Sequence, residues 1–517
     1  MKLESAFPSI HLQSTLVGNH INELLRYAEV QGRVVIITLF ASLCTVLPVG
    51  YNMVVLNVPE KSIQQALNES FIETLGVVLD MKGLSIFWSI TVAAQSIGAL
   101  IGCALVIPLD RHFGAKTCLL SVASSCLLLG SFVMACAQWL SFPPALLLGR
   151  ILSGIHTGLV CAFVPLFIQE VVPQKIKGSL SCSIHIGVCV GSAVAALLSL
   201  PFMLGSPSTW GLLLLFPAIF GLVALISSFF MPETPNRLLH AGSYTAAVDS
   251  IKFYYDLDVD DGEVAIQEYW SLVPETPDQM PLWTALSTPS IAKGILLGGV
   301  VSATQIFSGS MATISYSTSM FTAVSFIDAL IPFLPALGSI ISIILTLPSL
   351  QLVESHGRRP LLLKTLVLCL ISDVLFLIFS LLAVNPEDWW ASWLFAATFL
   401  LYGIGYNLGT GPVAYFLAAE LVPPEASTAS LGVAVAVNWA SSSLTTLAFY
   451  PLNQSIGGWS YMIFIVPSTF FLAFLWRFLP ETRHNYTVKP NEASNFCEVA
   501  STPYGTFEER LLADLVD

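Results

Sequence analysis

The stretch GYNMVVLN, residues Gly50–Asn57, places two amides and a phenol at the end of an apolar run that begins at Val34. Amide and phenol groups both donate and accept hydrogen bonds, but neither gains nor loses a proton near neutral pH. This stretch is therefore suited to holding polar partners inside an apolar environment and not to proton transfer.

A few titratable side chains also interrupt apolar runs. Arg150, in GRILSGIHTG, is costly at membrane depth and should face protein or water. Asp373 lies in the middle of another run, and His156 and His185 are able to titrate near neutral pH. These four residues are candidates for a charge-dependent function, although a buried structural partner is the simpler explanation for Asp373.

Other kinds of chemistry are not supported. The sequence has no Walker loop, no HExxH motif and no GxSxG motif, so we expect no enzyme and no ATP-driven pump. All ten cysteines except Cys497 fall in apolar runs without a CxxC pair. They are typical of small buried hydrophobes, and we expect no disulfide framework, no metal and no cofactor.

Composition shows what must position these residues. The chain of 517 residues is 55% hydrophobic and only 10% charged, with a mean hydropathy of +0.78. A soluble protein of this length needs roughly 25% charged residues to cover its surface. The chain is therefore an integral membrane protein. Its net charge of −13 gives no indication of a nucleic-acid partner.

Apolar runs long enough to cross a bilayer, about 20 residues each, predict twelve transmembrane helices and an all-α fold. The predicted spans are 34–56, 83–108, 116–137, 143–168, 177–202, 208–231, 291–323, 327–352, 360–383, 391–420, 427–451 and 457–479. The first thirty residues lack the pattern of a signal peptide, so insertion should use the first span.

Basic residues predict the orientation. In the twelve-span arrangement almost all of those in loops fall on one side, and only Lys61 and Lys82 fall on the other. The positive-inside rule then makes both termini and the central loop cytoplasmic. The sequon at Asn68 lies in the longest external loop and is a plausible glycosylation site. The sequon at Asn453 lies in a short external loop, and that at Asn485 is internal.

Three pairs of motifs indicate an internal duplication. DRHFGAK (110–116) is echoed by VESHGRR (353–359), FIQEVVP (167–173) by LAAELVP (417–423), and PETPNR (232–237) by PETRHN (480–485). The pairs occur in the same order at nearly one offset, which predicts two parallel six-helix repeats around a central cavity.

The duplication predicts five segments: residues 1–33 as a cytoplasmic N-terminal segment, 34–231 as the first half, 232–290 as a cytoplasmic linker, 291–484 as the second half, and 485–517 as an acidic cytoplasmic tail. The repeated charges suggest a cytoplasmic gate whose ion pairs break on opening; topological anchoring is the alternative. The gate candidates are Lys116, Glu170, Lys177, Glu233, Glu354, Arg358, Arg359, Glu420 and Glu481.

From Val34 to about Thr487 the chain resembles the sugar-porter branch of the major facilitator superfamily, most closely its facilitative hexose transporters. The resemblance is carried by GYNMVVLN with its spacing to Asn68, GRILSG (149–154), the paired PET motifs, SGSMATISYSTSMF (308–321) and ELVPPEASTASLGVAVAVNW (420–439). It implies alternating access to one central site for a hexose or related small polyhydroxy solute.

The resemblance also implies the substrate-binding positions, several of which are altered. The seventh span reads QIFSGSM where the family has Gln-Gln-Leu-Ser-Gly-Ile-Asn, so Gln305 is kept while Ile306 and Met311 replace amides. A Gln, an Asn and a Trp of the family are replaced by His185, Ser342 and Tyr415, respectively. Fewer amides should weaken binding of an ordinary hexose, because unpaired hydroxyls are costly to bury. The substrate-binding candidates are Gln305, His185, Tyr316, Tyr415, Asn438, Trp439 and Ser342.

Asn52 stands where proton-coupled relatives carry an Asp beside the Arg that corresponds to Arg150. Because an amide cannot titrate, we expect the Asn52 side chain to satisfy Arg150 without a charge cycle, and hence uniport. The alternatives are proton-dependent symport through His185 or Asp373, and a non-transporting nutrient receptor with the acidic tail as an interaction segment.

We expect a multi-pass protein in the plasma membrane, with partners limited to lipid and a monosaccharide-like solute. The sequence gives no indication of oligomeric state.

Overall fold

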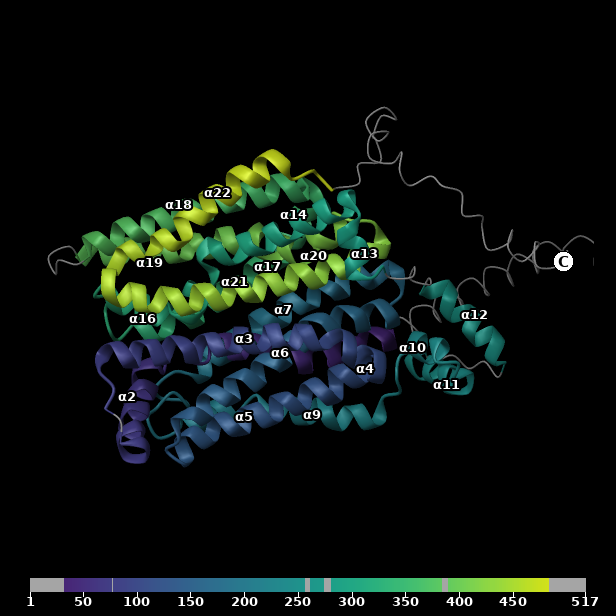
Figure 1. Cartoon of the computed structure of the whole chain (residues 1–517), viewed down its shortest axis with the longest axis horizontal. Helices are drawn as coiled ribbons and strands as arrows, with labels where there is room; N and C mark the ends of the chain where they lie inside the picture. Colours follow the sequence, from purple (N-terminus) through teal and green to yellow (C-terminus); the bar gives the residue numbers. More distant parts are fainter. Residues whose placement is uncertain (1–31, 77, 256–260, 274–279, 384–388, 483–517) are drawn as a thin grey trace, which may run out of the picture.

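The computed structural model describes residues 32–76, 78–255, 261–273, 280–383 and 389–482. Within these residues all regular elements are helices, and most lie along one direction in a single bundle (Figure 1). This confirms the all-α membrane fold predicted from composition. The predicted tail, 485–517, lies outside the described residues.

The first half forms the lower part of the bundle in Figure 1. Its membrane helices are Gly32–Val54, α3 (Met81–Phe113), the continuous stretch α4–η2–α5 (Ala115–Trp139), α6 (Pro143–Val171), α7 (Gln174–Leu198) and α8–α9 (Trp210–Phe230). A short helix, α2 (Glu60–Ser70), stands at the end of the bundle between the first span and α3.

The second half forms the upper part. Its elements are α14 (Pro289–Gln305), η3 (Ile306–Ser310), α15 (Met311–Ser315), α16 (Ser317–Ala323), α17 (Leu334–His356), α18 (Arg358–Leu382), α19 (Trp389–Gly405), η5 (Tyr406–Thr410), α20 (Gly411–Glu420), α21 (Ser427–Ile456) and α22 (Met462–Phe478). The stretch from α14 to α16 corresponds to the predicted seventh span.

Eight stretches of the described chain are long and apolar enough to cross a membrane, and the last of these, Pro424–Phe478, contains both α21 and α22. The remaining predicted spans correspond to α7, α17 and α19–α20. Together these helices account for the twelve predicted spans.

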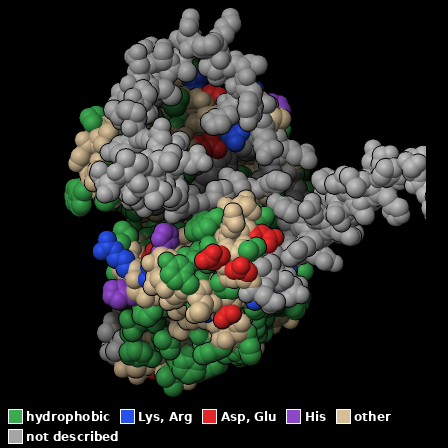
Figure 2. Space-filling model, turned by 90° about the vertical axis from the view of Figure 1, so that its right-hand side faces the viewer, with side chains coloured by type: hydrophobic (Ala, Val, Ile, Leu, Met, Phe, Trp, Pro, Cys, Tyr) green, Lys and Arg blue, Asp and Glu red, His purple; other side chains and the backbone are tan. Residues whose placement is uncertain are grey.

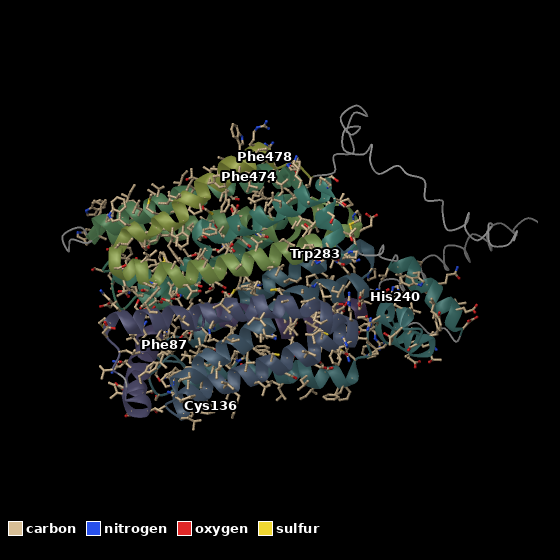
Figure 3. The ribbon with its side chains drawn as sticks, in the orientation of Figure 1. Phe87, Cys136, His240, Trp283, Phe474 and Phe478 are labelled. Atoms are coloured by element: carbon tan, nitrogen blue, oxygen red, sulfur yellow. The ribbon has the colours of Figure 1, made fainter. Side chains whose placement is uncertain are left out.

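Large apolar side chains cover the flanks of the bundle. Phe229 and Phe230 on α9 are 83% and 75% exposed, and Phe470 on α22 is 65% exposed. Figure 3 shows Phe474 and Phe478, also on α22, at the upper outer edge of the bundle. In water such a surface would associate, whereas in a bilayer it faces lipid.

Glycine contacts set the spacing of two central helices. A Cβ on Gly154 of α6 would lie 2.2 Å from the carbonyl oxygen of Gln95 on α3, and one on Gly98 would lie 2.2 Å from the carbonyl oxygen of Ile151. Helices α3 and α6 therefore approach so closely that only glycine fits at these crossings. Their contact places Arg150 of α6 against the backbone of α3.

The seventh span is broken where it passes the centre of the bundle. Gly309 has a φ of 92°, which lies in the region that favours glycine, and it interrupts the helix between α14 and α15. The break separates Gln305, on one side, from Thr313 and Ser317 on the other.

Three short helices cover the end of the bundle opposite α2: α10 (Pro235–His240), α11 (Tyr244–Tyr255) and α12 (Gly262–Leu272). The Tyr255 hydroxyl donates to the Val171 carbonyl, and the Tyr269 hydroxyl donates to the Glu170 carbonyl at 2.9 Å. Figure 2 shows this end, where acidic, basic and histidine side chains gather among apolar ones. These helices lie in the segment 232–290 predicted as the linker.

Candidate binding site and the contacts around it

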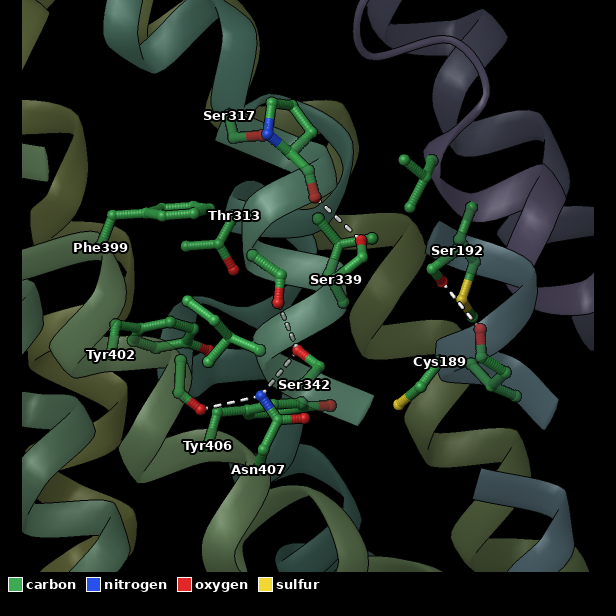
Figure 4. A pocket seen from close by; sticks show the side chains of 18 of the residues that line it. Cys189, Ser192, Thr313, Ser317, Ser339, Ser342, Phe399, Tyr402, Tyr406 and Asn407 are labelled. Atoms are coloured by element: carbon green, nitrogen blue, oxygen red, sulfur yellow. Dashed lines mark hydrogen bonds between the residues drawn. The ribbon is translucent and has the colours of Figure 1, made fainter. Parts of the chain in front are cut away.

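A pocket lies between the two halves near the break in the seventh span (Figure 4). The first half contributes residues of its first span and of α7, and the second half contributes residues of α15 to α17, α19 and η5. Its hydrogen-bonding side chains are His185, Ser192, Thr313, Ser317, Ser339, Ser342, Tyr402, Tyr406 and Asn407.

Asn407 contributes a side-chain amide to the lining of this pocket. Its Nδ2 donates to Ser342 Oγ at 2.9 Å and to the Gly403 carbonyl at 2.8 Å, so the side chain is held in one orientation (Figure 4). Its Oδ1 is an acceptor on the same fixed group. Asn407 was not among the predicted site residues. The amide in YNLGTGP, at the end of an apolar run, is the signal that could have indicated it.

The rest of the pocket wall is formed mainly by apolar and sulfur-containing side chains. Met53, Cys189, Met311 and Ile314 line the pocket together with Phe399, and the Cys189 thiol lies 3.7 Å from His185 Nε2. All lining residues described by the structure are neutral at pH 7 apart from the titratable His185. The pocket therefore suits a neutral molecule that has hydroxyl groups on one side and an apolar face on the other.

Of the predicted binding residues, His185 and Ser342 line the pocket. Gln305 and Asn438 lie behind it, where Asn438 Nδ2 donates to Gln305 Oε1 at 2.7 Å. Gln305 Nε2 donates to the Gly411 carbonyl at 3.1 Å and to the hydroxyl of the lining residue Tyr406 at 3.3 Å. These two amides satisfy one another in this structure and support the pocket wall.

The predicted aromatic residues also lie away from the lining. The Tyr316 hydroxyl donates to the Thr446 carbonyl at 3.0 Å, which fastens the seventh span to α21. Trp439 is buried on α21. The side chain of Tyr415 lies outside the described residues. Roles in binding for all seven predicted residues, His185 and Ser342 included, remain predictions.

The contact between Arg150 and Asn52 differs from the expectation. Arg150 Nη1 donates to the backbone carbonyl of Asn52 at 2.7 Å, and its other nitrogens approach the carbonyls of Thr91 and Val92 at 3.4 and 3.5 Å. Neither atom of the Asn52 side-chain amide has a hydrogen-bond partner in the described structure. The expectation that the side chain satisfies Arg150 was wrong in this respect, because the carbonyls of tightly packed helices already do so.

The remaining titratable candidates are buried. The two ring nitrogens of His156 lie 3.0 and 3.1 Å from the carbonyl oxygens of Ala123 and Thr45, so this side chain packs between three helices. Asp373 on α18 lies against the break in the seventh span, where its Oδ1 would be 2.8 Å from a Cβ on Gly309. Neither residue lines the pocket.

At the α10–α12 end the first half forms a carboxylate clamp. Glu233 accepts the backbone N–H groups of Lys116 and Thr117 at 2.9 and 3.0 Å, and Glu170 accepts the Thr234 hydroxyl at 2.6 Å. The Lys116 ammonium donates to the Ser228 carbonyl at 2.7 Å. The carboxylate of Glu233 thus caps the start of the third span.

The second half repeats this clamp. Glu481 accepts the N–H groups of Arg358 and Arg359 at 2.9 and 3.2 Å, and Glu420 pairs with Arg358 Nε at 3.3 Å and accepts the Thr482 hydroxyl at 2.5 Å. The equivalence of the two clamps supports the duplication inferred from the motifs. Lys177 lies at the start of α7, and the side chain of Glu354 lies outside the described residues.

At the α2 end, hydrogen bonds join the two halves directly. Asn57 donates to the Ile314 carbonyl at 2.9 Å and to Ser317 Oγ at 2.7 Å, and it accepts the Thr318 N–H at 2.9 Å. Asn57 belongs to the first half and its three partners belong to the second. The structure is therefore closed at the α2 end.

Comparisons with known proteins agree with this architecture. The family model described as "Sugar (and other) transporter" matches residues 37–493. The mouse solute carrier family 2 facilitated glucose transporter member 7 is 27% identical over 476 residues, which cover 90% of each chain. Rat member 3 is 31% identical over 439 residues, which cover 84% of this chain and 87% of that one.

Solved structures show the same fold. The partially occluded inward-open conformation of the xylose transporter XylE from E. coli gives a TM-score of 0.71 at 21% identity, covering 88% of this chain and 99% of that chain. A second structure, the proton:xylose symporter XylE bound to 6-bromo-6-deoxy-D-glucose, gives 0.66 at 19% identity and covers 88% and 97%. The chain belongs to the sugar transporter family, the sugar-porter branch of the major facilitator superfamily.

Proposed function

We propose that the protein carries a hexose or related small polyhydroxy solute across the membrane by alternating access, without a coupled ion. The observation that carries this proposal is the pocket to which both halves contribute uncharged hydrogen-bonding side chains. A site shared between two halves opens to one side or the other as the halves rock. The named relatives are transporters, which agrees with the expectation that the chain is not an enzyme.

The pocket supports a solute that is less polar than an ordinary hexose. A hexose carries about five hydroxyls that each need partners when buried. Asn407 and Ser342 form one polar side, whereas Met53, Met311 and Ile314 form a side with no strong hydrogen-bonding group. Several relatives are named as facilitated glucose transporters, and XylE binds a hexose that has bromine in place of one hydroxyl. A hexose with a missing or masked hydroxyl fits this distribution best.

The absence of ion coupling is supported by the surroundings of Arg150. Its described hydrogen bonds all go to backbone carbonyls, which carry no proton to release. Asn52 beside it has a side chain that does not titrate. Alternating access in this half therefore needs no change of charge at Arg150.

Proton-dependent symport is the second candidate, because XylE is named as a proton symporter. His185 favours it most, since it lines the pocket where a proton and a solute can meet. Asp373 lies farther away, behind the seventh span. The receptor alternative rests on the altered binding positions and on the acidic tail, which is outside the described residues.

The orientation follows from the basic residues of the sequence. We infer that both termini and the α10–α12 end are cytoplasmic, and that the α2 end, with the partly buried Asn68 as a glycosylation candidate, faces outward. In this frame the two carboxylate clamps lie on the cytoplasmic side and belong to the gate. We assign the protein to the plasma membrane, because a chain with an external glycan site requires a secretory route.

Uptake into liposomes that contain the purified protein tests the proposal. Labelled D-glucose, 2-deoxy-D-glucose, 6-deoxy-D-glucose, D-xylose and myo-inositol are compared with an organic anion. We expect a deoxyhexose to equilibrate fastest and the anion not to enter. Solute that binds without reaching the lumen would support a receptor and contradict the proposal.

A further inference from the structure

A second set of bonds joins the halves at the α2 end, and it contains a carboxyl group. Glu60 is the first residue of α2 and Gln64 lies one turn later. The Tyr450 hydroxyl of α21 donates to Glu60 Oε1 at 2.7 Å, and Gln64 Nε2 donates to the Tyr450 oxygen at 2.9 Å and to Glu60 Oε1 at 3.3 Å. These three side chains form one network across the interface between the halves.

Glu60 is held out of water by this closure. The residue is only 6% exposed, and its Oε2 has no hydrogen-bond partner in the described structure. Lys61, next to it on α2, is exposed, while Tyr316 from the seventh span lies behind Tyr450, 5.2 Å away between ring centres. The charged and titratable groups facing Glu60 are therefore Tyr450, Tyr316 and the solvated Lys61.

A carboxylate in this position is unfavourable. Burial without a paired cation disfavours its charged form. Burial raises the pKa of Glu60 from 4.5 to about 7, although the hydrogen bonds from Tyr450 and Gln64 and the charge of Lys61 act in the opposite direction. When the halves separate at this end, Glu60 leaves Tyr450 and regains water, so its pKa returns toward the ordinary value.

We propose that Glu60, Gln64 and Tyr450 form a proton-dependent latch that favours closure of the α2 end when Glu60 is protonated. The inference rests on the proposed alternating access, since a latch requires two states. The neighbouring Asn57 contacts fasten the same end through an amide that does not titrate. The Asn57 hydrogen bonds therefore stabilise the closed α2 end at every pH, and the Glu60 network adds a contribution that depends on pH.

The direction of the effect follows from linkage. Because the pKa of Glu60 is higher in the closed state, that state binds the proton more tightly. Closure is favoured fully below about pH 4.5, and this contribution is lost as the pH rises through about 7. Acid on the α2 side thus shifts the population toward the closed state.

This device regulates transport and does not couple it to a proton. Glu60 follows the first span and is part of the loop helix α2, not of a membrane helix. A proton that binds when the α2 end closes is released to the same side when that end opens. The latch therefore adds pH dependence to the rate without carrying a proton across the membrane.

Hydrogen–deuterium exchange of the full-length protein in lipid nanodiscs tests the latch without any solute. Amide protection in α2 is measured between pH 5 and 8 and corrected for intrinsic exchange. We expect protection to rise at least about threefold as the pH falls from 8 to 6. Glu60→Gln, which mimics the protonated carboxyl, should show high protection at every pH.

Two further variants separate the latch from general stability. Tyr450→Phe removes the donor across the interface and should lower protection in α2 over the whole range. Glu69→Gln, at an exposed position of the same helix, should behave like the original protein. Protection that does not change with pH, or a pH response retained in Glu60→Gln, would overturn the latch while leaving the proposed transport untouched.

Discussion

At the scale of single residues, the proposed transport assigns the choice of solute to the polar groups of the pocket. Asn407 is the amide whose orientation is fixed by Ser342 and Gly403, and in the proposal it binds hydroxyls on one side of the pocket. The sequence indicated amides as the binding chemistry, and of its candidates Ser342 and His185 line the pocket, while their roles in binding stay predictions. It did not indicate Asn407: the amide in YNLGTGP marks a polar group in an apolar run, but the residue types do not show that η5 turns this side chain toward Ser342 of α17.

Replacing Asn407 by Ala should weaken solute affinity. The variant removes a hydrogen-bonding group from the pocket, which is worth about 1–3 kcal/mol and corresponds to roughly 5- to 150-fold in the half-saturation concentration. Concentration-dependent uptake into liposomes measures this. Thr398→Ala is the matched control, since Thr398 is buried on the same span but bonds only within its own helix, to Leu394. Equal losses in the two variants would indicate a packing role for Asn407.

Asn52→Asp should introduce pH-dependent transport. The new carboxylate would lie beside Arg150, whose Nη1 is 2.7 Å from the Asn52 carbonyl, and would add an ionisable group to a site that lacks one. Uptake rates from pH 5 to 8 measure the effect. Asn453→Asp, on the same chain near the α2 end and bonded to Ser460, serves as the control. A flat pH profile in Asn52→Asp would show that the Asn52 side chain does not communicate with Arg150.

At the scale of helices, packing and breaks position these residues. The apolar runs predicted the spans to within a few residues, because the hydrophobic length of a membrane helix is fixed by the bilayer. The break at Gly309 and the π-helical turn η5 could not be read from hydropathy, since both depend on contacts with α18 and α17. Those two irregular turns are what place Thr313 and Asn407 in the pocket.

The crossing of α3 and α6 gives a test of packing. Gly154→Ala places a methyl group 2.2 Å from the Gln95 carbonyl, so the helices must separate and loosen the contacts of Arg150. Overpacking of this kind costs about 1–3 kcal/mol. We expect a melting temperature several degrees lower in detergent by a fluorescence assay. Gly432→Ala, with no atom within 4 Å of the new methyl, should melt like the original protein, and equal shifts would contradict the packing account.

At the scale of the whole molecule, the two six-helix halves repeat the same arrangement of helices and motifs. The paired motifs allowed the duplication to be inferred from sequence, and the structure shows why both copies keep a glutamate after their sixth helix. Glu233 and Glu481 each cap the start of the third helix in their own half. The sequence suggested ion pairs with basic side chains, and Glu420 does pair with Arg358. Hydrogen bonds from backbone N–H groups to a carboxylate were not predicted, because every residue except proline has a backbone N–H group and residue types do not show which of them is bonded.

Removal of either cap should have similar effects. Glu233→Ala and Glu481→Ala each leave two N–H groups without their carboxylate, at a cost of about 1 kcal/mol. We expect comparable reductions in melting temperature and altered transport rates in both variants. Glu263→Ala, on the exposed surface of α12, is the control. A large loss for one cap and none for the other would contradict functional equivalence of the halves.

The central claim is that solute moves down its own gradient through a pocket shared by the halves, with no proton travelling alongside. The most direct measurement is solute accumulation in proteoliposomes under an imposed pH gradient, with equal 6-deoxy-D-glucose or D-glucose on both sides at the start. The account predicts that the pH gradient changes the rate of exchange but leaves the internal and external concentrations equal. A lasting accumulation driven by the pH gradient alone, abolished by a protonophore, would contradict it.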